Sequence, residues 1–462
     1  MAWHDNLGSP KARHEAAIIV REFAGRGTDI GGVATEDGRG AAFMYAEGQF
    51  LAREQYLDDI QAVLGDRAQA VVAGRVIGDI VLVKLNFPAG NGGTPAESND
   101  SAPESNGGNA GNAEDGAEPA EGNGGITEGE QPWLPQFLGE IHAAHGPRIA
   151  ALDHVVTVAP ETAGCPATEP QEVYDPKPYP PICPGKGGDG VRIYVADTGI
   201  VHDTVTKSSW LEGVTGDADP FIVADGTILH YGGHGTFVAG VIRSMAPGAE
   251  IVVKKVFDTA GSALESDFVP KLSEGFAYGA EIFHVTVASP TMNNLPLMAF
   301  EAWMEHLRQH KGVVCVVPAG NNHERKPCWP GGFAGIISVG ALSTDWRSRA
   351  YFSNFGGPVD VYAPGQNLVN ALATGPYTCE VDPFKGEVRH FSGMAQWSGT
   401  SFSAPIVTGL IAARMARYGE SGQEAAAALL AQARAQAIPG VGPVLLPRCG
   451  DDDDQRPATS PI

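Results

Sequence analysis

The sequence predicts an α/β fold, with a parallel sheet that has helices on both faces and follows a small α+β region. From Val191 onward, nearly continuous apolar runs at 191–200, 250–257, 281–289 and 312–320 alternate with helix-like stretches such as 265–280. Runs that are apolar on both faces are typical of parallel strands covered by helices. Function in such sheets gathers at the carboxyl ends of the strands.

Residues 41–160 have a different pattern, with shorter elements in the order βαββαβ. We expect strands at 41–46, 69–73, 76–85 and 152–160, and helices at 50–65 and 133–146. This order predicts one small sheet with two helices. A stretch rich in Gly, Asn, Ala, Glu, Ser and Pro, at 89–131, interrupts it and is typical of a disordered linker.

These patterns divide the chain into consecutive segments. We expect an N-terminal extension at 1–40, the α+β region at 41–160, a Pro-rich connection at 161–190, the parallel-sheet domain at 191–447 and a disordered acidic tail at 448–462.

The charge excludes nucleic-acid binding as the main function. The 462 residues include 31 Lys and Arg against 54 Asp and Glu, a net charge of −23. Nine acidic residues in 89–130 and four in 451–454, less Arg456, place 12 of these charges outside the expected folded parts. Nucleic-acid binders instead present basic patches.

The N-terminal residues have no basic start followed by an apolar stretch, and the chain has no run of 18 apolar residues. We therefore expect a cytoplasmic protein that does not enter a membrane. None of the six cysteines is in C-x-x-C spacing, so we interpret them as free thiols with no zinc site. If the protein is exported, pairs such as Cys165 with Cys183 become plausible.

Three short motifs carry candidate catalytic side chains. VADTGI places Asp197 at the end of a strand, HYGGHGTFVAGVI places His234 before a helix-like run, and SGTSFSAP places Ser401 at the start of another. A serine hydroxyl is a poor nucleophile unless a base takes its proton and an acid orients that base. Asp197, His234 and Ser401 supply these roles.

The three motifs closely resemble those of the subtilisin-like serine peptidases. The resemblance implies that Asp197 orients His234 and that His234 activates Ser401. It also places Asn321, in VVPAGNN, in the oxyanion hole together with the backbone N–H of Ser401. SVGAL at 338–342, FSNFG at 352–356 and VYAPG at 361–365 extend the resemblance over about 190–418.

The candidate catalytic residues also allow structural interpretations. Each catalytic candidate is of a type that often occupies a turn or a helix cap, but the joint order and the flanking glycines favour catalysis. The G-x-S-x-G elbow is absent around Ser401, which disfavours an α/β-hydrolase esterase. Two hypotheses remain: an active serine endopeptidase that cuts protein or peptide substrates, and a catalytically silent or partner-gated binding module.

The specificity segment departs from the family. Where relatives usually read N-x-S-L-G-G, this chain has HVTVAS, with His284 and then Thr286, Val287, Ala288 and Ser289. The resemblance implies that these last four residues, with Pro318, Ala319 and Gly320, bind substrate. Loss of glycine is expected to narrow the pocket and favour small or medium apolar side chains before the cut. Phe237 and Phe402 also differ from the usual residues, and we interpret them as packing choices.

The resemblance has two further implications. Calcium is a possible cofactor because relatives often bind it, but no site can be aligned here and no other cofactor is indicated. The βαββαβ region resembles the prodomain of such peptidases, which implies an intramolecular inhibitor that is cut away within 160–190. A tethered domain of unrelated role is the alternative.

Overall fold

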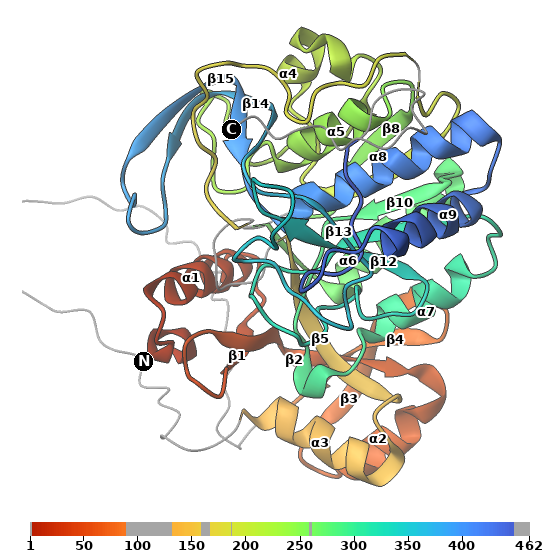
Figure 1. Ribbon diagram of the computed structural model, residues 1–462. Coiled ribbons are helices and arrows are strands. Elements are labelled where there is room, and N and C mark those ends of the chain that lie inside the picture. The colour runs from red at the N-terminus through yellow and green to blue at the C-terminus, as the bar shows by residue number, and fades with distance from the viewer. Residues whose placement is uncertain (1, 89–131, 159–166, 186, 258–260, 448–462) are drawn as a thin grey trace, which may run out of the picture.

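The computed structural model describes residues 2–88, 132–158, 167–185, 187–257 and 261–447 (Figure 1). The predicted linker at 89–131 and the tail at 448–462 lie outside these ranges. Within them, no helix is long and apolar enough to cross a membrane.

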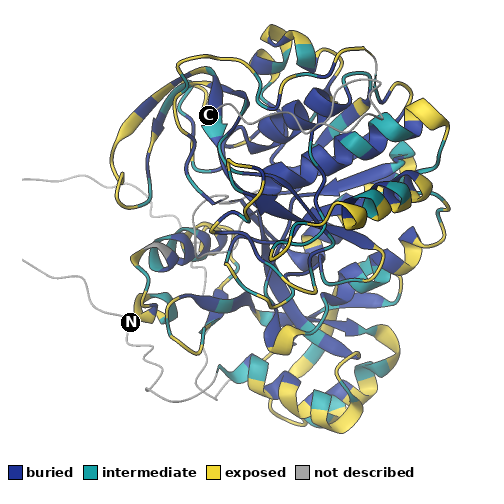
Figure 2. Ribbon diagram, in the orientation of Figure 1, coloured by how far each residue is buried: buried dark blue, intermediate teal, exposed yellow. Residues whose placement is uncertain are grey.

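The predicted parallel sheet is confirmed. Its seven strands are all parallel and follow the order β13-β12-β11-β10-β6-β8-β7. They are β6 (Arg192–Asp197), β7 (Thr215–Gly216), β8 (Glu250–Lys255), β10 (Ile282–Val285), β11 (Val314–Pro318), β12 (Ile336–Leu342) and β13 (Val361–Pro364). Every residue of β10, β11, β12 and β13 is buried, as their two-sided apolar runs require (Figure 2).

Helices cover the sheet in two groups. The helices α5 (His234–Met245), α8 (Thr400–Tyr418) and α9 (Gly422–Ala435) pack together. The helices α6 (Glu265–Tyr278) and α7 (Met298–Leu307) pack against each other and contact the N-terminal strands. Shorter helices are α4 (His202–Lys207), η3 (Ser209–Leu211) and η4 (Met292–Asn294). An antiparallel hairpin, β14 (Leu368–Thr378) with β15 (Val388–Trp397), leads into α8.

The N-terminal region has the expected βαββαβ order. It consists of β2 (Ala41–Arg53), α2 (Leu57–Leu64), β3 (Gln69–Ile77), β4 (Ile80–Asn86), α3 (Trp133–His145) and β5 (Ala150–Thr157), with η2 (Glu54–Tyr56) before α2. The helix expected from Phe50 begins only at Leu57. Residues 50–52 are fully buried and pair with both β4 and β5, so tertiary contacts keep them in the strand.

The first 40 residues pack on this same sheet. The strand β1 (Ile30–Ala34) pairs antiparallel with β2, and η1 (Trp3–Asn6) and α1 (Pro10–Ala24) precede it. Ser9 caps α1 by accepting a hydrogen bond from the Ala12 N–H. One apolar cluster joins Ala16 and Phe23 of α1 to Val155 of β5 and Leu264 of β9 (Ser262–Leu264).

The strand β9 joins the two regions. It pairs antiparallel with β5, so the N-terminal sheet runs β3-β4-β2-β5-β9 and ends on a strand of the parallel-sheet region. The last strand before the connection thus lies against the part of the molecule that carries Asp197, His234 and Ser401.

The cysteines differ from expectation at one position. Cys183 is disulfide-bonded, so the interpretation of all six as free thiols is wrong there, whereas Cys315, Cys328 and Cys379 are free and buried. Spacing along the chain does not report which residues the fold brings together, which is why the sequence alone left this pairing open.

Candidate active site

Asp197 and His234 lie in direct contact. Asp197 is the last residue of β6, and His234 is the first residue of α5. The His234 Nδ1 is 2.8 Å and 3.0 Å from the two carboxylate oxygens of Asp197. Both side chains are fully buried. Burial by itself would raise the pKa of Asp197, but the charge and hydrogen bond of His234, together with hydrogen bonds from Thr198 and Thr286, outweigh burial and lower that pKa, so the carboxylate stays charged beside the imidazole.

Glycines make this contact possible. Gly233 caps α5 with a left-handed backbone, φ 81°, which a residue with a Cβ rarely adopts. A Cβ on Gly235 would lie 2.3 Å from the Gly199 carbonyl oxygen and 3.1 Å from Asp197. The glycines of the D-T-G and G-G-H-G motifs therefore let the two segments approach each other.

Ser401 is the second residue of α8 and is fully buried. Its position at a helix N-terminus favours negative charge nearby. Its hydroxyl donates a long hydrogen bond, 3.4 Å, to the carbonyl oxygen of Val158, just beyond the end of β5. The His234 Nε2 makes no hydrogen bond within the described part of the chain. The N-terminal region therefore places a peptide carbonyl at the serine.

Asn321 lies beside the start of the same helix. It follows β11, and its side-chain oxygen accepts hydrogen bonds of 2.9 Å from both the N–H and the hydroxyl of Thr400. Gly320 before it has φ 103°, and a Cβ there would lie 2.5 Å from the Asn354 amide nitrogen. Asn321 and Ser401, 80 residues apart in sequence, thus flank one helix start.

The predicted substrate-binding residues fall into two groups. Ala288 and Ser289 contact Thr157: the Ala288 N–H donates to its carbonyl at 3.3 Å, and the Ser289 hydroxyl accepts from its N–H at 3.1 Å. The others are buried in or beside the sheet. Thr286 donates its hydroxyl to the Ala196 carbonyl, and Val287, Pro318, Ala319 and Gly320 are buried.

Trp329 was not singled out from the sequence. Ser289 and Trp329 exchange both backbone hydrogen bonds, at 2.8 Å and 2.9 Å, so Trp329 lies along the far side of the specificity segment. A lone tryptophan before a proline carries no sequence signal for this role.

Asp219 was also missed. It is buried, and its carboxylate accepts hydrogen bonds from the Thr198 hydroxyl at 2.9 Å and the Gly233 N–H at 2.8 Å. It thereby ties the residue after Asp197 to the residue before His234. Burial raises the pKa of Asp219 to about 6.

An aromatic layer packs against the His234 ring. The rings of Trp397 and Phe402 lie 5.7 Å and 5.2 Å from it, and Phe237 contacts both at 5.8 Å and 4.4 Å. Phe237 and Phe402 thus pack together, as interpreted from the sequence. Because Phe402 follows Ser401, this layer also brings the serine end of α8 to the histidine.

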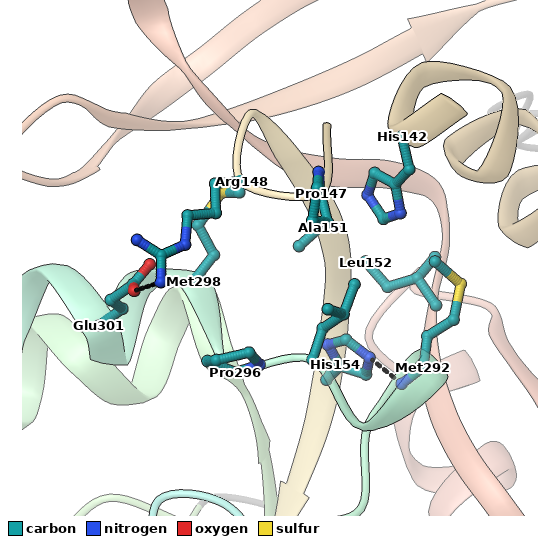
Figure 3. Close-up of a pocket in the computed structure, with 11 residues that line it drawn as sticks. His142, Pro147, Arg148, Ala151, Leu152, His154, Met292, Pro296, Met298 and Glu301 are labelled. Carbon is teal, nitrogen blue, oxygen red and sulfur yellow. Dashed lines mark hydrogen bonds and ion pairs between the residues drawn. The ribbon is translucent and has the colours of Figure 1, made fainter. Parts of the chain in front are cut away.

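A cavity of about 280 Å³ lies away from Ser401, at the junction of the two regions (Figure 3). His142, Arg148 and His154 line it from the N-terminal side, and Met292, Met298 and Glu301 from the other. Two polar contacts border it: Arg148 pairs with Glu301 at 3.6 Å, and the Met292 N–H donates to the His154 Nε2 at 3.1 Å. Side chains of the two regions therefore do not completely fill the space between them at this place.

Calcium has no evident site in the described residues, because they contain no group of three or more His, Cys, Asp or Glu side chains arranged to hold a metal ion.

The fold is a parallel α/β sheet in which Asp197 and His234 are in direct contact, and Ser401 lies at the start of the helix whose next residue, Phe402, packs on the His234 ring. The model of the subtilase family matches residues 188–450, and the chain belongs to that family.

Two curated relatives and one solved structure illustrate the similarity. The thermophilic serine proteinase of Bacillus sp. (strain AK1) is 30% identical over 271 residues, which cover 56% of this chain and 59% of the relative. Thermitase of Thermoactinomyces vulgaris is 28% identical over 267 residues, or 55% of this chain and 84% of the relative. Fervidolysin from Fervidobacterium pennivorans has a similar fold, with a TM-score of 0.52 at 20% identity over 87% of this chain and 60% of that one. The chain thus spans less than two thirds of the first relative.

Proposed function

We propose that this chain is a serine endopeptidase that hydrolyses peptide bonds through an acyl-enzyme on Ser401. The observation that carries the proposal is the peptide carbonyl of Val158, 3.4 Å from the Ser401 hydroxyl oxygen, on a strand that pairs with the enzyme as an extended substrate would. The contact between Asp197 and His234 supports it, and so does family membership.

Each candidate catalytic residue has a separate role in the proposed hydrolysis. The His234 Nε2 takes the proton of the Ser401 hydroxyl while the oxygen bonds to the carbonyl carbon of the substrate. The negative charge on the former carbonyl oxygen is stabilised by the Asn321 amide and the Ser401 N–H. His234 then gives its proton to the leaving amine, the C–N bond breaks, and the acyl-enzyme remains. Water, deprotonated by His234, splits the ester and frees the acid. Asp197 holds the imidazole and balances its positive charge throughout.

The N-terminal region acts in this proposal as an intramolecular inhibitor. The strand β5 pairs with β9 in three residue pairs, and the Val158 N–H donates to the Gly261 carbonyl at 2.9 Å. These contacts supply the backbone pairing that a substrate needs, and all three catalytic side chains are buried in the uncut chain. The silent-module hypothesis has no comparable support, because the buried site is accounted for by a covering strand.

Cleavage is proposed close to Val158. The connection was expected to be cut within 160–190, whereas the Val158 carbonyl at Ser401 supports a cut directly after Val158 or within the next few residues, just before that range or at its beginning. We expect the wild-type chain to be cut there, as mass spectrometry of purified protein would show. A chain that hydrolyses added peptides yet stays uncut would leave the N-terminal region as a tethered domain.

A small or medium apolar side chain before the cut is proposed as the preferred substrate feature. Ala288 and Ser289 carry side chains where the family has glycines, and Trp329 lies behind Ser289. An added methyl group in a tight pocket changes discrimination by about 1 to 3 kcal/mol. A peptide library with Ala, Val, Leu, Tyr, Trp or Arg before the cut tests this: aliphatic residues should lead, and a strong preference for Trp or Arg would contradict it.

A further inference from the structure

The connection continues past the catalytic serine as a strap, residues 167–172, that lies on the hairpin β14–β15. Gln171 and Gln396 exchange backbone hydrogen bonds of 2.8 Å each, antiparallel, and the Ala167 N–H donates to the Ser398 carbonyl at 3.1 Å. Ser398 is three residues before Ser401. The strap therefore pairs with the backbone that leads directly into the nucleophile.

Hydrogen bonds that involve a side chain hold four further residues of the strap, which are Thr168, Glu169, Pro170 and Glu172. The Trp397 indole N–H donates to the Thr168 carbonyl at 2.6 Å, and Arg389 donates to the Pro170 carbonyl at 2.8 Å. Three more polar groups of the hairpin bind the strap's two glutamates: the Tyr377 hydroxyl (2.9 Å) and the Glu380 N–H (2.6 Å) donate to Glu169, and the His390 N–H (2.6 Å) to Glu172. Glu169 is buried, so its charge is held by these donors and not by water.

The strap lies on the leaving-group side of the site. Catalysis requires His234 to pass its proton to the leaving amine, so that amine must lie next to the imidazole. Trp397 contacts the imidazole with its ring and the strap with its indole N–H. On the acyl side, β5 reaches Ser401 from β9 and from Ala288, which are separate from β15. The two ends of the connection thus occupy opposite sides of the serine.

The strap also buries an apolar side chain beside the site. Ala167 is fully buried in a small cluster with Ala341, Ala350 and Phe352. A substrate that pairs with β15 past the cut, as the strap does, needs the same backbone groups of Gln396 and Ser398. Cleavage near Val158 leaves these contacts intact, because all of them lie beyond the cut.

We infer that the strap remains on the hairpin after cleavage and restricts the enzyme to substrates with short leaving groups, of about one residue. The inference rests on the proposed acyl-enzyme chemistry at Ser401, and it narrows the proposed endopeptidase to peptide bonds near the carboxyl terminus of a substrate. Longer leaving segments compete with the eight hydrogen bonds that hold the strap. The natural substrate class would then be peptides cut at or near their carboxyl terminus.

A series of peptides that differ only after the cut tests this inference. One peptide with Ala before the cut is joined to p-nitroaniline, and others to one, two or four residues followed by a quencher. With the processed wild-type enzyme, kcat/KM should fall at least about tenfold from one to four leaving residues. Equal kcat/KM across the series would overturn the inference, whereas no hydrolysis of any peptide, the nitroanilide included, would instead refute the peptidase function.

Two variants that loosen the strap sharpen the test. Glu169→Ala removes the acceptor for Tyr377 and Glu380 on the strap, and Arg389→Met removes the hairpin's donor to the Pro170 carbonyl. Either should raise kcat/KM for the four-residue leaving group toward that for one residue and leave the nitroanilide rate unchanged. Lys177→Ala, at an exposed ion pair with Asp175 further along the connection, is the matched control and should change nothing. If both loosening variants cleave the nitroanilide normally but the length dependence persists, the strap is not its cause.

Discussion

The parallel-sheet region and the N-terminal region differ in how far their strands are buried. In the first, β10, β11 and β12 are buried along their whole length, and one apolar core spans the sheet and its helices. In the second, β3 has no buried residue (Figure 2). The surface between the regions buries ionisable groups, among them Asp153, His154 and Glu265.

Buried ionisable groups are costly unless they are paired or neutral, and each of these three is perturbed. Burial raises the pKa of Asp153 to about 6 and of Glu265 to about 8, and lowers that of His154 to about 4. Apolar burial inside the parallel-sheet region is insensitive to pH, whereas the junction combines apolar contacts with these buried ionisable groups, so its contribution to stability changes with pH. This difference suits a permanent domain joined to a removable one.

Ser401→Ala, in the parallel-sheet region, should have the largest effect of the substitutions considered. We expect hydrolysis to fall by about 10⁶-fold and fluorophosphonate labelling to disappear, because no other group replaces the hydroxyl. The fold should stay intact, since the side chain is small, and mass spectrometry should find the chain uncut. Turnover near the wild-type rate would remove Ser401 from the mechanism.

Asn321→Ala, also in the parallel-sheet region, should have a smaller effect on hydrolysis than Ser401→Ala. Its amide acts on the charge that develops in the transition state, so kcat should fall by about 10²- to 10³-fold with little change in KM. Steady-state kinetics on the nitroanilide measure both constants. A rise in KM at unchanged kcat would point to substrate binding instead.

Asp153→Ala tests the junction. The Asp153 carboxylate accepts hydrogen bonds from the Ser266 N–H at 3.0 Å, the Ser266 hydroxyl at 2.7 Å and the Gln49 amide at 2.7 Å, and so caps α6 from the N-terminal side. Its removal should lower the free energy of unfolding by about 1 to 3 kcal/mol, because buried donors lose their acceptor. Denaturant unfolding in the uncut Ser401→Ala background measures this. Asp79→Ala, at a half-exposed ion pair with Arg53, is the control and should cost less than about 1 kcal/mol.

His154→Gln tests the pH dependence of the junction. Between pH 6.5 and about 4 the unfolded chain holds a proton on His154 that the folded chain does not, so this residue lowers stability as pH falls through that window. Asp153 and Glu265 act oppositely: their raised pKa values mean that the folded chain binds the proton first, and stability gains as pH falls below about 6 and about 8. In the Ser401→Ala background, the His154→Gln variant should therefore gain about 1 to 2 kcal/mol at pH 5 relative to pH 7, compared with its parent. Parallel pH curves for the two chains would contradict it.

Much of the fold was predictable because its signals are local. The two-sided apolar runs predicted β6, β10 and β11, and the flanking glycines marked the segments around Asp197, His234 and Ser401. The order βαββαβ was readable from alternating patterns. The end of β2 was not, because Phe50–Ala52 are strand residues only through pairing with β4 and β5.

The sequence alone determined the parallel α/β class, the family resemblance and the identity of the candidate catalytic residues, because these depend on residue type, local spacing and periodicity. Only the tertiary structure decided which distant groups share the site: the Val158 carbonyl at Ser401, Asp219 behind the Asp197–His234 pair, Trp329 behind Ser289, and the strap on β15. Each of these is a contact between segments far apart in the chain, mostly through backbone N–H and C=O groups. Every residue carries those groups, so their partners leave no mark in the sequence and are chosen by packing.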